Sequence, residues 1–293
     1  MNRKYIVFDC DCTFGVKDCD VDDGLALMYL LGCEDASLLG VTATYGNHEL
    51  PVVWEALQKL LKDLGRSEIP VKKGGAQSGC GVSEAADFLV KMADLHSGEL
   101  SILATGSLTN LWGAWEKDHT FFDKVKEIVL MGGITSPLVF EKKVMDELNF
   151  SCDPHAAWTV LTKGKKVSVI TGNNCLKVLF TKQEYRERLF GTDHPAAVYI
   201  REQTDYWFGY NETDYGIEGF YNWDVTAAVY LMHPELFVED EGMYLITEDD
   251  LRSGFLRKSE MGVCTLNLPQ IGQEVPFKDA IYESWMNIST VRL

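Results

Sequence analysis

The sequence predicts an α/β fold with a mainly parallel, Rossmann-like sheet flanked by helices, and with additional helices and short strands in the C-terminal third. Two observations favour this fold. Short apolar runs alternate with helical patterns from residue 4 to about residue 175, and acidic or glycine clusters follow the apolar runs. Such alternation is typical of a parallel sheet covered by helices on both faces. No internal repeat or linker divides the 293 residues, so we expect a single domain over residues 1–293.

The expected elements follow one another in chain order. We predict strands at the apolar runs 4–9, 38–46, 69–74, 100–106, 125–133 and 166–172. We predict helices at the segments 21–33, 49–65, 83–96, 108–117 and 153–164. The pattern then becomes mainly helical to residue 233, with short strands over 242–268 and a closing helix over 279–290. Ligands of such sheets bind beyond the carboxyl ends of the strands, so we expect one shared site at that edge.

The composition limits the classes of partner. The chain has 44 acidic and 27 basic residues, and its net charge is −17. Such a surface repels phosphate backbones and anionic lipids, so we expect no nucleic-acid partner and no membrane partner. The N-terminal apolar run is too short for a signal peptide, and the eight cysteines lack C-x-x-C spacing. We therefore expect a cytoplasmic protein with reduced thiols.

A cluster of aspartates between residues 9 and 23 is the most informative feature of the sequence. It comprises Asp9, Asp11, Asp18, Asp20, Asp22 and Asp23. Asp9 and Asp11 end a strand and share one face of it, whereas Asp22 and Asp23 begin a helix. Helix capping explains negative charge in the second pair but not in the first. If the intervening loop folds away, the four carboxylates converge, and such an oxygen-rich site suits calcium or magnesium.

Two other interpretations of this cluster can be weighed from the residues. The segment "VFDCDCT" matches the D-x-D-x-T motif of haloacid dehalogenase-type phosphatases, in which Asp9 would be the nucleophile beside magnesium. That chemistry also needs a later lysine and a late acidic pair, for which Asp249 and Asp250 stand in poor context. An EF-hand loop starting at Asp9 fails, because Phe14 occupies the position that requires glycine. The phosphatase remains an alternative at this stage.

Six motifs in order resemble the inosine/uridine-type nucleoside hydrolase family. They are the D-x-D and D-D pairs of the aspartate cluster, "YGNHEL", "LATGSLTNL", "KEIVLMGG", "DELNFSCDPHAA" and "YNWDVTAAVYLMHPELF", which together span roughly residues 4–235. The phosphatase resemblance rests on one motif. The family resemblance implies a nucleoside hydrolase-like fold and calcium-dependent cleavage of the bond between ribose and a nucleobase. A third possibility, from another class, is a calcium-dependent nucleoside or ribose binding protein without catalysis.

The resemblance also implies a role for each matched residue. Asp11 would be both a calcium ligand and the base that takes a proton from the attacking water. The calcium ligands would be Asp11, Asp23, the backbone carbonyl of Thr109, and Asp224. The ribose hydroxyls would be held by Asp22, Asn47, Glu147 and Asn149, with the backbone of Met131 nearby and Asp9 supporting the site from behind. A carboxylate-rich pocket suits the positive charge that grows on ribose as the bond breaks.

The sequence departs from the family pattern in three places. The turn between the two aspartate pairs is longer, through the segment "CTFGVKDC". Trp223 precedes Asp224 where many members carry a histidine, which implies stacking on the base and favours purine nucleosides. The family's asparagine between "MGG" and "ELN" is missing, so we expect Ser136 or Glu141 to take its place.

Two further expectations concern the base and the assembly. Tyr206 and Tyr210 lie four residues apart and share one face of a predicted helix. They either pack in the core or form a lid over the nucleobase. Family members are often dimers or tetramers, so the resemblance implies a homodimer or homotetramer that acts on a small-molecule nucleoside.

Overall fold

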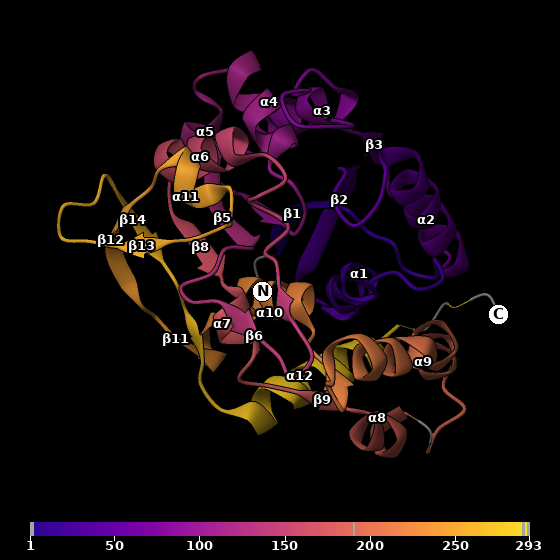
Figure 1. Ribbon diagram of the computed structural model, residues 1–293. Helices are drawn as coiled ribbons and strands as arrows, with labels where there is room; N and C mark the ends of the chain where they lie inside the picture. Colours follow the sequence, from indigo (N-terminus) through magenta and orange to yellow (C-terminus); the bar gives the residue numbers. More distant parts are fainter. Residues whose placement is uncertain (1–2, 190, 289–290, 292–293) are drawn as a thin grey trace.

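A computed structural model describes residues 3–189, 191–288 and 291 of the chain (Figure 1). The described residues form a central sheet in the order β13-β12-β14-β8-β5-β4-β1-β2-β3. Its strands, in chain order, are β1 (Lys4–Cys10), β2 (Ala36–Ala43), β3 (Val71–Lys73), β4 (Leu100–Ala104), β5 (Val125–Met131), β8 (Val167–Ile170), β12 (Glu241–Leu245), β13 (Arg257–Lys258) and β14 (Cys264–Asn267). The pairs from β14 to β3 are parallel, whereas β12 runs antiparallel to both its neighbours. The predicted fold class is confirmed.

Helices cover both faces of this sheet (Figure 1). They are α1 (Asp22–Gly32), α2 (Leu50–Asp63), α3 (Glu84–Leu95), α4 (Thr109–Lys117), α5 (Phe121–Lys124), α6 (Pro154–Lys163), α7 (Gly172–Cys175), α8 (Lys182–Leu189), α9 (Pro195–Tyr215), α10 (Trp223–Met232), α11 (Glu248–Leu251) and α12 (Glu274–Met286), with a 3₁₀ turn at Pro234–Leu236. Figure 1 shows α3 to α6 along one side, α1, α10 and α12 along the other, and α8 with α9 beyond α12. None of the described helices is both long and apolar enough to span a membrane.

The side chains of β1 explain why the sheet needs two layers of helices. Ile6 and Phe8 pack into the core on the α1 side, and Val7 packs into the core on the α3 side. All three are fully buried. A strand buried on both faces reads as a continuous apolar run in the sequence, as the segment 4–9 does.

The short elements lie around the carboxyl edge and the C-terminal third. They are the strand pairs β6 (Leu138–Val139) with β7 (Val144–Met145), β9 (Phe180–Thr181) with β10 (Gly219–Phe220), and β11 (Phe237–Val238) with β15 (Gln270–Ile271). The closing helix begins at Glu274, five residues before its predicted start, and ends at Met286. Residues 289 and 290 of that prediction lie outside the described residues. The prediction of a single domain stays a prediction.

Candidate active site

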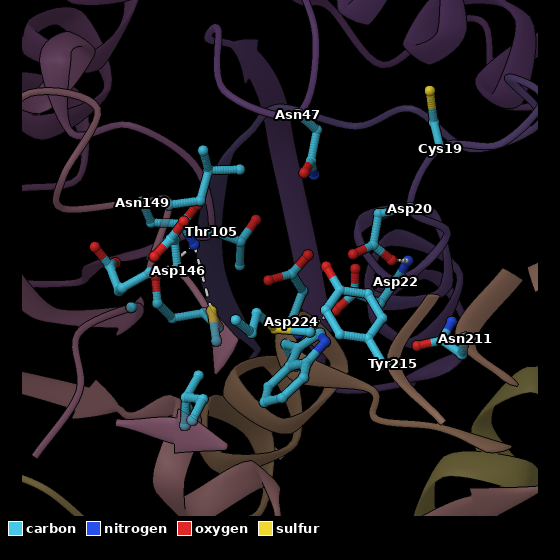
Figure 2. A pocket seen from close by; sticks show the side chains of 18 of the residues that line it. Cys19, Asp20, Asp22, Asn47, Thr105, Asp146, Asn149, Asn211, Tyr215 and Asp224 are labelled. Carbon is cyan, nitrogen blue, oxygen red and sulfur yellow. Dashed lines mark hydrogen bonds between the residues drawn. The ribbon is translucent and has the colours of Figure 1, made fainter. Parts of the chain in front are cut away.

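A cavity of about 290 Å³ opens at the carboxyl edge of the parallel strands. Its walls come from the segments that follow β1, β4, β5 and β8, from the loop before α6, and from α9 and α10. Figure 2 shows Asp20, Asp22 and Tyr215 on one side of this cavity and Thr105, Asp146 and Asn149 on the other. This cavity therefore lies at the predicted location of the site, beyond the carboxyl ends of the strands.

Three carboxylates meet at the base of the cavity. One oxygen from each of Asp22, Asp23 and Asp224 lies within 4.8 Å of the others. All three side chains are buried. They come from the first turns of α1 and α10, which pack against each other, and the backbone N–H of Asp224 donates to Asp22 Oδ2 at 2.9 Å. Burial, together with the charges of the neighbouring aspartates, raises the pKa of Asp224 well above its usual range. A bound cation would offset this repulsion.

Asp11 completes this cluster from the end of β1. Its Oδ2 accepts the backbone N–H of Asn47 at 2.5 Å, whereas its Oδ1 is buried without a hydrogen-bond partner among the described residues. A Cβ atom added at Gly106 would lie 3.0 Å from Asp11 Oδ1, so glycine at this position gives the carboxylate room. Burial raises the pKa of Asp11 to about 7.

The donor set fits a hard divalent cation. An orphaned buried carboxylate oxygen beside three converging carboxylates is costly unless a cation or proton satisfies it. The cluster offers oxygen atoms and no nitrogen or sulfur ligand, which is the preference of calcium and magnesium. Asp11, Asp22, Asp23 and Asp224 therefore form a candidate metal centre at the base of the cavity.

Thr105, a neighbour of the predicted Thr109 in the sequence, contacts the carboxylate cluster. The Thr105 hydroxyl donates to Asp23 Oδ1 at 2.7 Å, and Thr105 lines the cavity. Thr109 is instead the first residue of α4, where its carbonyl points along the helix and its hydroxyl donates to Asp153 Oδ2 at 2.7 Å. The Thr105 hydroxyl therefore lies beside the carboxylate cluster, whereas the Thr109 hydroxyl lies beside Asp153. Both threonines belong to "LATGSLTNL", and only Thr105 directly follows strand β4.

Asp9 lies behind the cavity and does not line it. Its Oδ1 accepts the hydroxyl of Thr42 at 2.5 Å and the side-chain amide of Asn110 at 2.7 Å. Burial raises the pKa of Asp9 to about 7. A carboxylate held in this way cannot reach a phosphate ester in the cavity, and no described residue that lines the cavity is lysine or arginine. The structure therefore speaks against the phosphatase alternative.

The residues predicted to hold ribose all line the cavity. They are Asp22, Asn47, Met131, Glu147 and Asn149. Glu147 accepts backbone N–H groups from Gly133 at 3.0 Å, Phe150 at 2.8 Å and Ser151 at 2.9 Å. These bonds fix the orientation of its carboxylate.

Two amide side chains are among these residues. Asn149 donates its side-chain amide to the carbonyl of Met131 at 3.0 Å. Asn47 directs its amide toward Asp23 Oδ2 at 3.4 Å. Asn47 is therefore held beside the carboxylates and Asn149 beside the backbone of Met131, and each keeps hydrogen-bonding capacity for a ligand.

The missing asparagine is not replaced by either expected residue. Ser136 instead accepts the side-chain amide of Asn173 at 2.9 Å, and Glu141 packs beside Gly216. Asp146 and Met145 line the cavity in that region. Sequence reasoning missed Asp146, because the segment between β5 and Glu147 has no regular periodicity from which a direction could be read.

An aromatic wall faces the carboxylates, and it differs in part from the predicted lid. Trp207, Tyr210 and Tyr215 of α9 line the cavity with Trp223 of α10. The rings of Trp207 and Tyr210 are stacked, with centroids 4.7 Å apart and an interplanar angle of 10°. Tyr206 does not line the cavity.

The hydroxyl of Tyr206 instead holds the loop between β1 and α1. It donates to the carbonyls of Val16 at 3.0 Å and Cys19 at 2.7 Å. Trp207, Asn211 and Tyr215 are four residues apart, so they share a helix face that Tyr206 does not. This spacing could have identified the wall from the sequence.

The longer turn predicted between the aspartate pairs reaches the cavity. Asp18, Cys19 and Asp20 of this segment line it. Asp20 Oδ1 accepts the backbone N–H of Val21 at 2.6 Å and lies 3.4 Å from that of Asp22. Burial and the charge of Asp22 raise the pKa of Asp20 well above its usual range. Figure 2 shows the Cys19 side chain pointing away from the carboxylates.

Comparisons with known proteins agree with this geometry. The sequence profile of the family described as inosine-uridine preferring nucleoside hydrolase matches residues 6–275. The chain is 27% identical over 266 residues to a probable uridine nucleosidase 2 of Oryza sativa subsp. japonica, which covers 81% of this chain and 78% of the relative. It is 24% identical over 272 residues to the inosine-uridine preferring nucleoside hydrolase of Crithidia fasciculata, with 81% of each chain covered.

Two solved structures share the fold. The plant nucleoside hydrolase PpNRh1 superposes with a TM-score of 0.84 at 23% identity, covering 97% of this chain and 99% of the other. A purine-preferring ribonucleoside hydrolase from Gardnerella vaginalis superposes with a TM-score of 0.85 at 21% identity, covering 98% and 99%. The sheet and the helices around the cavity are therefore those of a known fold.

Proposed function

The chain belongs to the inosine-uridine preferring nucleoside hydrolase family, and on that premise we propose calcium-dependent cleavage of a purine ribonucleoside into ribose and free base. The protein is a glycosidase that acts on N-glycosyl compounds, in keeping with the family and with relatives named nucleosidase and nucleoside hydrolase. The observation that carries the proposal is the carboxylate centre of Asp22, Asp23 and Asp224 at the base of the cavity, with the orphaned Oδ1 of Asp11 beside it.

The ligands of calcium would be Asp11, Asp23, Asp224 and Thr105, the last in place of the predicted Thr109. Bound calcium would supply positive charge that orients the ribose diol and lowers the pKa of a nearby water. Calcium is proposed over magnesium because three aspartates and a threonine from four separate segments form an irregular set of oxygen donors, and calcium tolerates irregular geometry better than magnesium does.

The residues of the chain carry out the remaining steps. Asp11 accepts the proton of the attacking water, and its backbone bond to Asn47 holds the carboxylate in place. Asp22, Asn47, Glu147 and Asn149 orient the ribose hydroxyls, and the Met131 backbone lies beside them. Positive charge develops on ribose as the bond to the base breaks, and the surrounding carboxylates stabilise that charge. Asp9, which is held by Thr42 and Asn110, supports the site from behind the cavity.

The aromatic wall would hold the nucleobase. Trp223, Trp207, Tyr210 and Tyr215 present flat rings that can stack on a heterocycle. A purine offers a larger face than a pyrimidine, which supports the purine preference. Some relatives are named for uridine or for pyrimidine nucleosides. The first assay should therefore compare purine with pyrimidine nucleosides.

The experiment is a product assay on the full chain. Reducing sugar is measured from a panel of purine and pyrimidine nucleosides with calcium, beside phosphate released from phosphate esters. Ribose release, fastest with a purine nucleoside, is the expected result. Phosphate release would favour the phosphatase, and calcium-dependent nucleoside binding without any product would favour a binding protein. Sedimentation in solution separates the homodimer from the homotetramer.

A further inference from the structure

One side chain among the rings of the aromatic wall is an amide. The described lining residues of α9 are Trp207, Tyr210, Asn211 and Tyr215. Because Trp207, Asn211 and Tyr215 follow one another at intervals of four residues, the amide lies on the same helix face as two of the rings, one turn from each. The proposed function uses the rings to stack on the base and gives Asn211 no task.

A hydrogen bond fixes the orientation of this amide. Asn211 Nδ2 donates to the backbone carbonyl of Trp207 at 2.9 Å. A reversed amide would bring Oδ1 against that carbonyl oxygen, so the nitrogen must face Trp207. Figure 2 shows the side-chain oxygen of Asn211 directed toward Tyr215. The amide therefore presents its acceptor, Oδ1, to a ligand.

This acceptor has no donor within the protein. No described residue donates a hydrogen bond to Asn211 Oδ1, although Asn211 is only 4% exposed. Water can satisfy the acceptor while the cavity is open. A ligand that displaces this water and supplies no donor leaves Oδ1 unpaired in a buried place, which is unfavourable. The amide therefore favours a ligand that carries a hydrogen-bond donor.

The end of α9 that carries Asn211 is held in place. The backbone carbonyl of Asn211 accepts the N–H of Ile217 at 3.2 Å. Lys142, in the turn between β6 and β7, donates to the carbonyls of Glu212 at 2.7 Å and Thr213 at 3.1 Å. An acceptor on a restrained helix end needs little ordering when a ligand binds, so its hydrogen bond can contribute to selection.

Purine bases differ in what they present to such an acceptor. Hypoxanthine carries an N–H group at position 1 of its six-membered ring. Unsubstituted purine carries a lone pair at that position and has no donor on the ring. Against Oδ1, the N–H group forms a hydrogen bond, whereas the lone pair repels the oxygen and leaves both atoms unpaired.

Resting on the proposed function, we propose that Asn211 is a specificity-determining residue, which selects ribosides whose base presents an N–H donor on its six-membered ring. Asn211 Oδ1 accepts this N–H group while the base stacks on the neighbouring rings. Aromatic rings stack on any flat heterocycle, so the amide supplies a discrimination that the rings cannot. The ribosides of 6-oxopurines belong to the selected class.

The test compares inosine with purine riboside, which lacks the donor, on the full chain with calcium. The glycosidic bonds of the two substrates differ in intrinsic strength, but this difference is the same in every variant. The informative quantity is therefore the ratio of kcat/KM for inosine to that for purine riboside in wild type, divided by the same ratio in Asn211→Leu. We expect this double ratio to be about 10, carried mainly by a higher KM for inosine in the variant.

Two control variants separate the hydrogen bond from other effects. Glu212→Gln changes the next residue of α9, which is exposed and does not line the cavity, and should give a double ratio of about 1. Trp207→Phe reduces the ring available for stacking and keeps the backbone carbonyl that holds Asn211. It should slow both substrates alike and also give a double ratio of about 1.

A measurement on wild type alone covers the case in which Asn211→Leu does not fold. Free hypoxanthine and free purine are added to the inosine assay. Hypoxanthine should inhibit ribose release at a concentration about 10-fold lower than purine requires, because only hypoxanthine supplies the donor on the six-membered ring.

The possible failures are distinguishable. A double ratio of about 1 in folded Asn211→Leu, or equal inhibition of wild type by the two free bases, would overturn recognition by Asn211 while nucleoside hydrolysis stands. Hydrolysis of neither nucleoside by wild type would overturn the proposed function itself.

Discussion

The inner half of the cavity and its outer wall are built on different principles. The inner half consists of buried carboxylates at the end of β1 and the starts of α1 and α10, and backbone or threonine donors hold those of Asp11, Asp22 and Asp23. The outer wall consists of α9, the loop over residues 12–20 and the segment before Glu147, with several exposed members. Chemistry common to a family belongs in the inner half, and the choice of base belongs in the outer wall. The substitutions that follow test residues of the inner half and of the outer wall separately.

Asp11→Asn should have the largest effect, because it removes the base and weakens the metal centre together. We expect ribose release from any nucleoside to fall by more than roughly 10²-fold. Circular dichroism should show an unchanged fold. Asp193→Asn, an isolated charge change in the loop before α9, is the matched control and should keep its activity. Turnover retained by Asp11→Asn would remove Asp11 from the mechanism.

Chelation of metal should make the stability of the protein depend on pH. Asp9 and Asp11 have pKa values of about 7 in the folded metal-free protein, raised mainly by burial, against about 4 in the unfolded chain. The folded state therefore binds more protons between these values, and its free energy of unfolding falls as pH rises from about 4 to about 7.

Bound calcium should largely remove this dependence of the free energy of unfolding on pH, because the metal favours the charged carboxylates. Urea unfolding at a series of pH values, with chelator and with calcium, measures both curves. A chelated protein that gains stability over this interval would show that the carboxylates are not buried as described.

Thr105→Ala and Thr109→Ala compare the hydroxyl that contacts Asp23 with the hydroxyl that contacts Asp153. Thr105→Ala removes a buried donor to Asp23, a loss of about 1.5–3 kcal/mol for a bond to a charged group. It should weaken the apparent calcium affinity seen in activity. Thr109→Ala removes the bond to Asp153, which caps α6, and should lower the unfolding midpoint with little change in calcium affinity. The reverse result would show that the Thr105 hydroxyl does not support the metal centre.

Tyr206→Phe and Tyr210→Phe should give the smallest effects. Tyr206→Phe removes a hydroxyl whose one proton is shared between the carbonyls of Val16 and Cys19, at a cost of about 1 kcal/mol. Removing that restraint should lower kcat/KM several-fold. Tyr210→Phe keeps the ring stacked on Trp207 and should be close to wild type. Steady-state kinetics on one purine nucleoside measures kcat/KM of the two variants. Equal values of kcat/KM would show that Tyr206 does not position the loop.

The sequence was a good guide to the inner half of the site for a physical reason. Strand ends and helix starts are read directly from periodicity, so Asp11, Asp22 and Asp23 could be placed on elements that converge. The assignment of Asp22 and Asp23, rather than Asp18 and Asp20, to the start of α1 agrees with the helix that follows. Thr105 was missed although it follows β4, because its motif also contains a second threonine.

The outer wall was harder to foresee because it depends on tertiary packing. Tyr206 and Tyr210 are close in sequence, yet one turns to the loop over residues 12–20 and the other to the cavity. Asp146 and Asp20 sit in irregular segments, whose side-chain directions follow from neighbours distant in sequence. One part of the outer wall was predictable. The helical spacing of Trp207, Asn211 and Tyr215 places these three residues on one helix face.

The most direct test of the account is a product balance in wild type with and without calcium. The account predicts one ribose and one free base for each nucleoside consumed, with loss of both products when calcium is chelated and recovery when it is returned. Product release that is unaffected by complete removal of the metal would contradict the role given to the carboxylate centre.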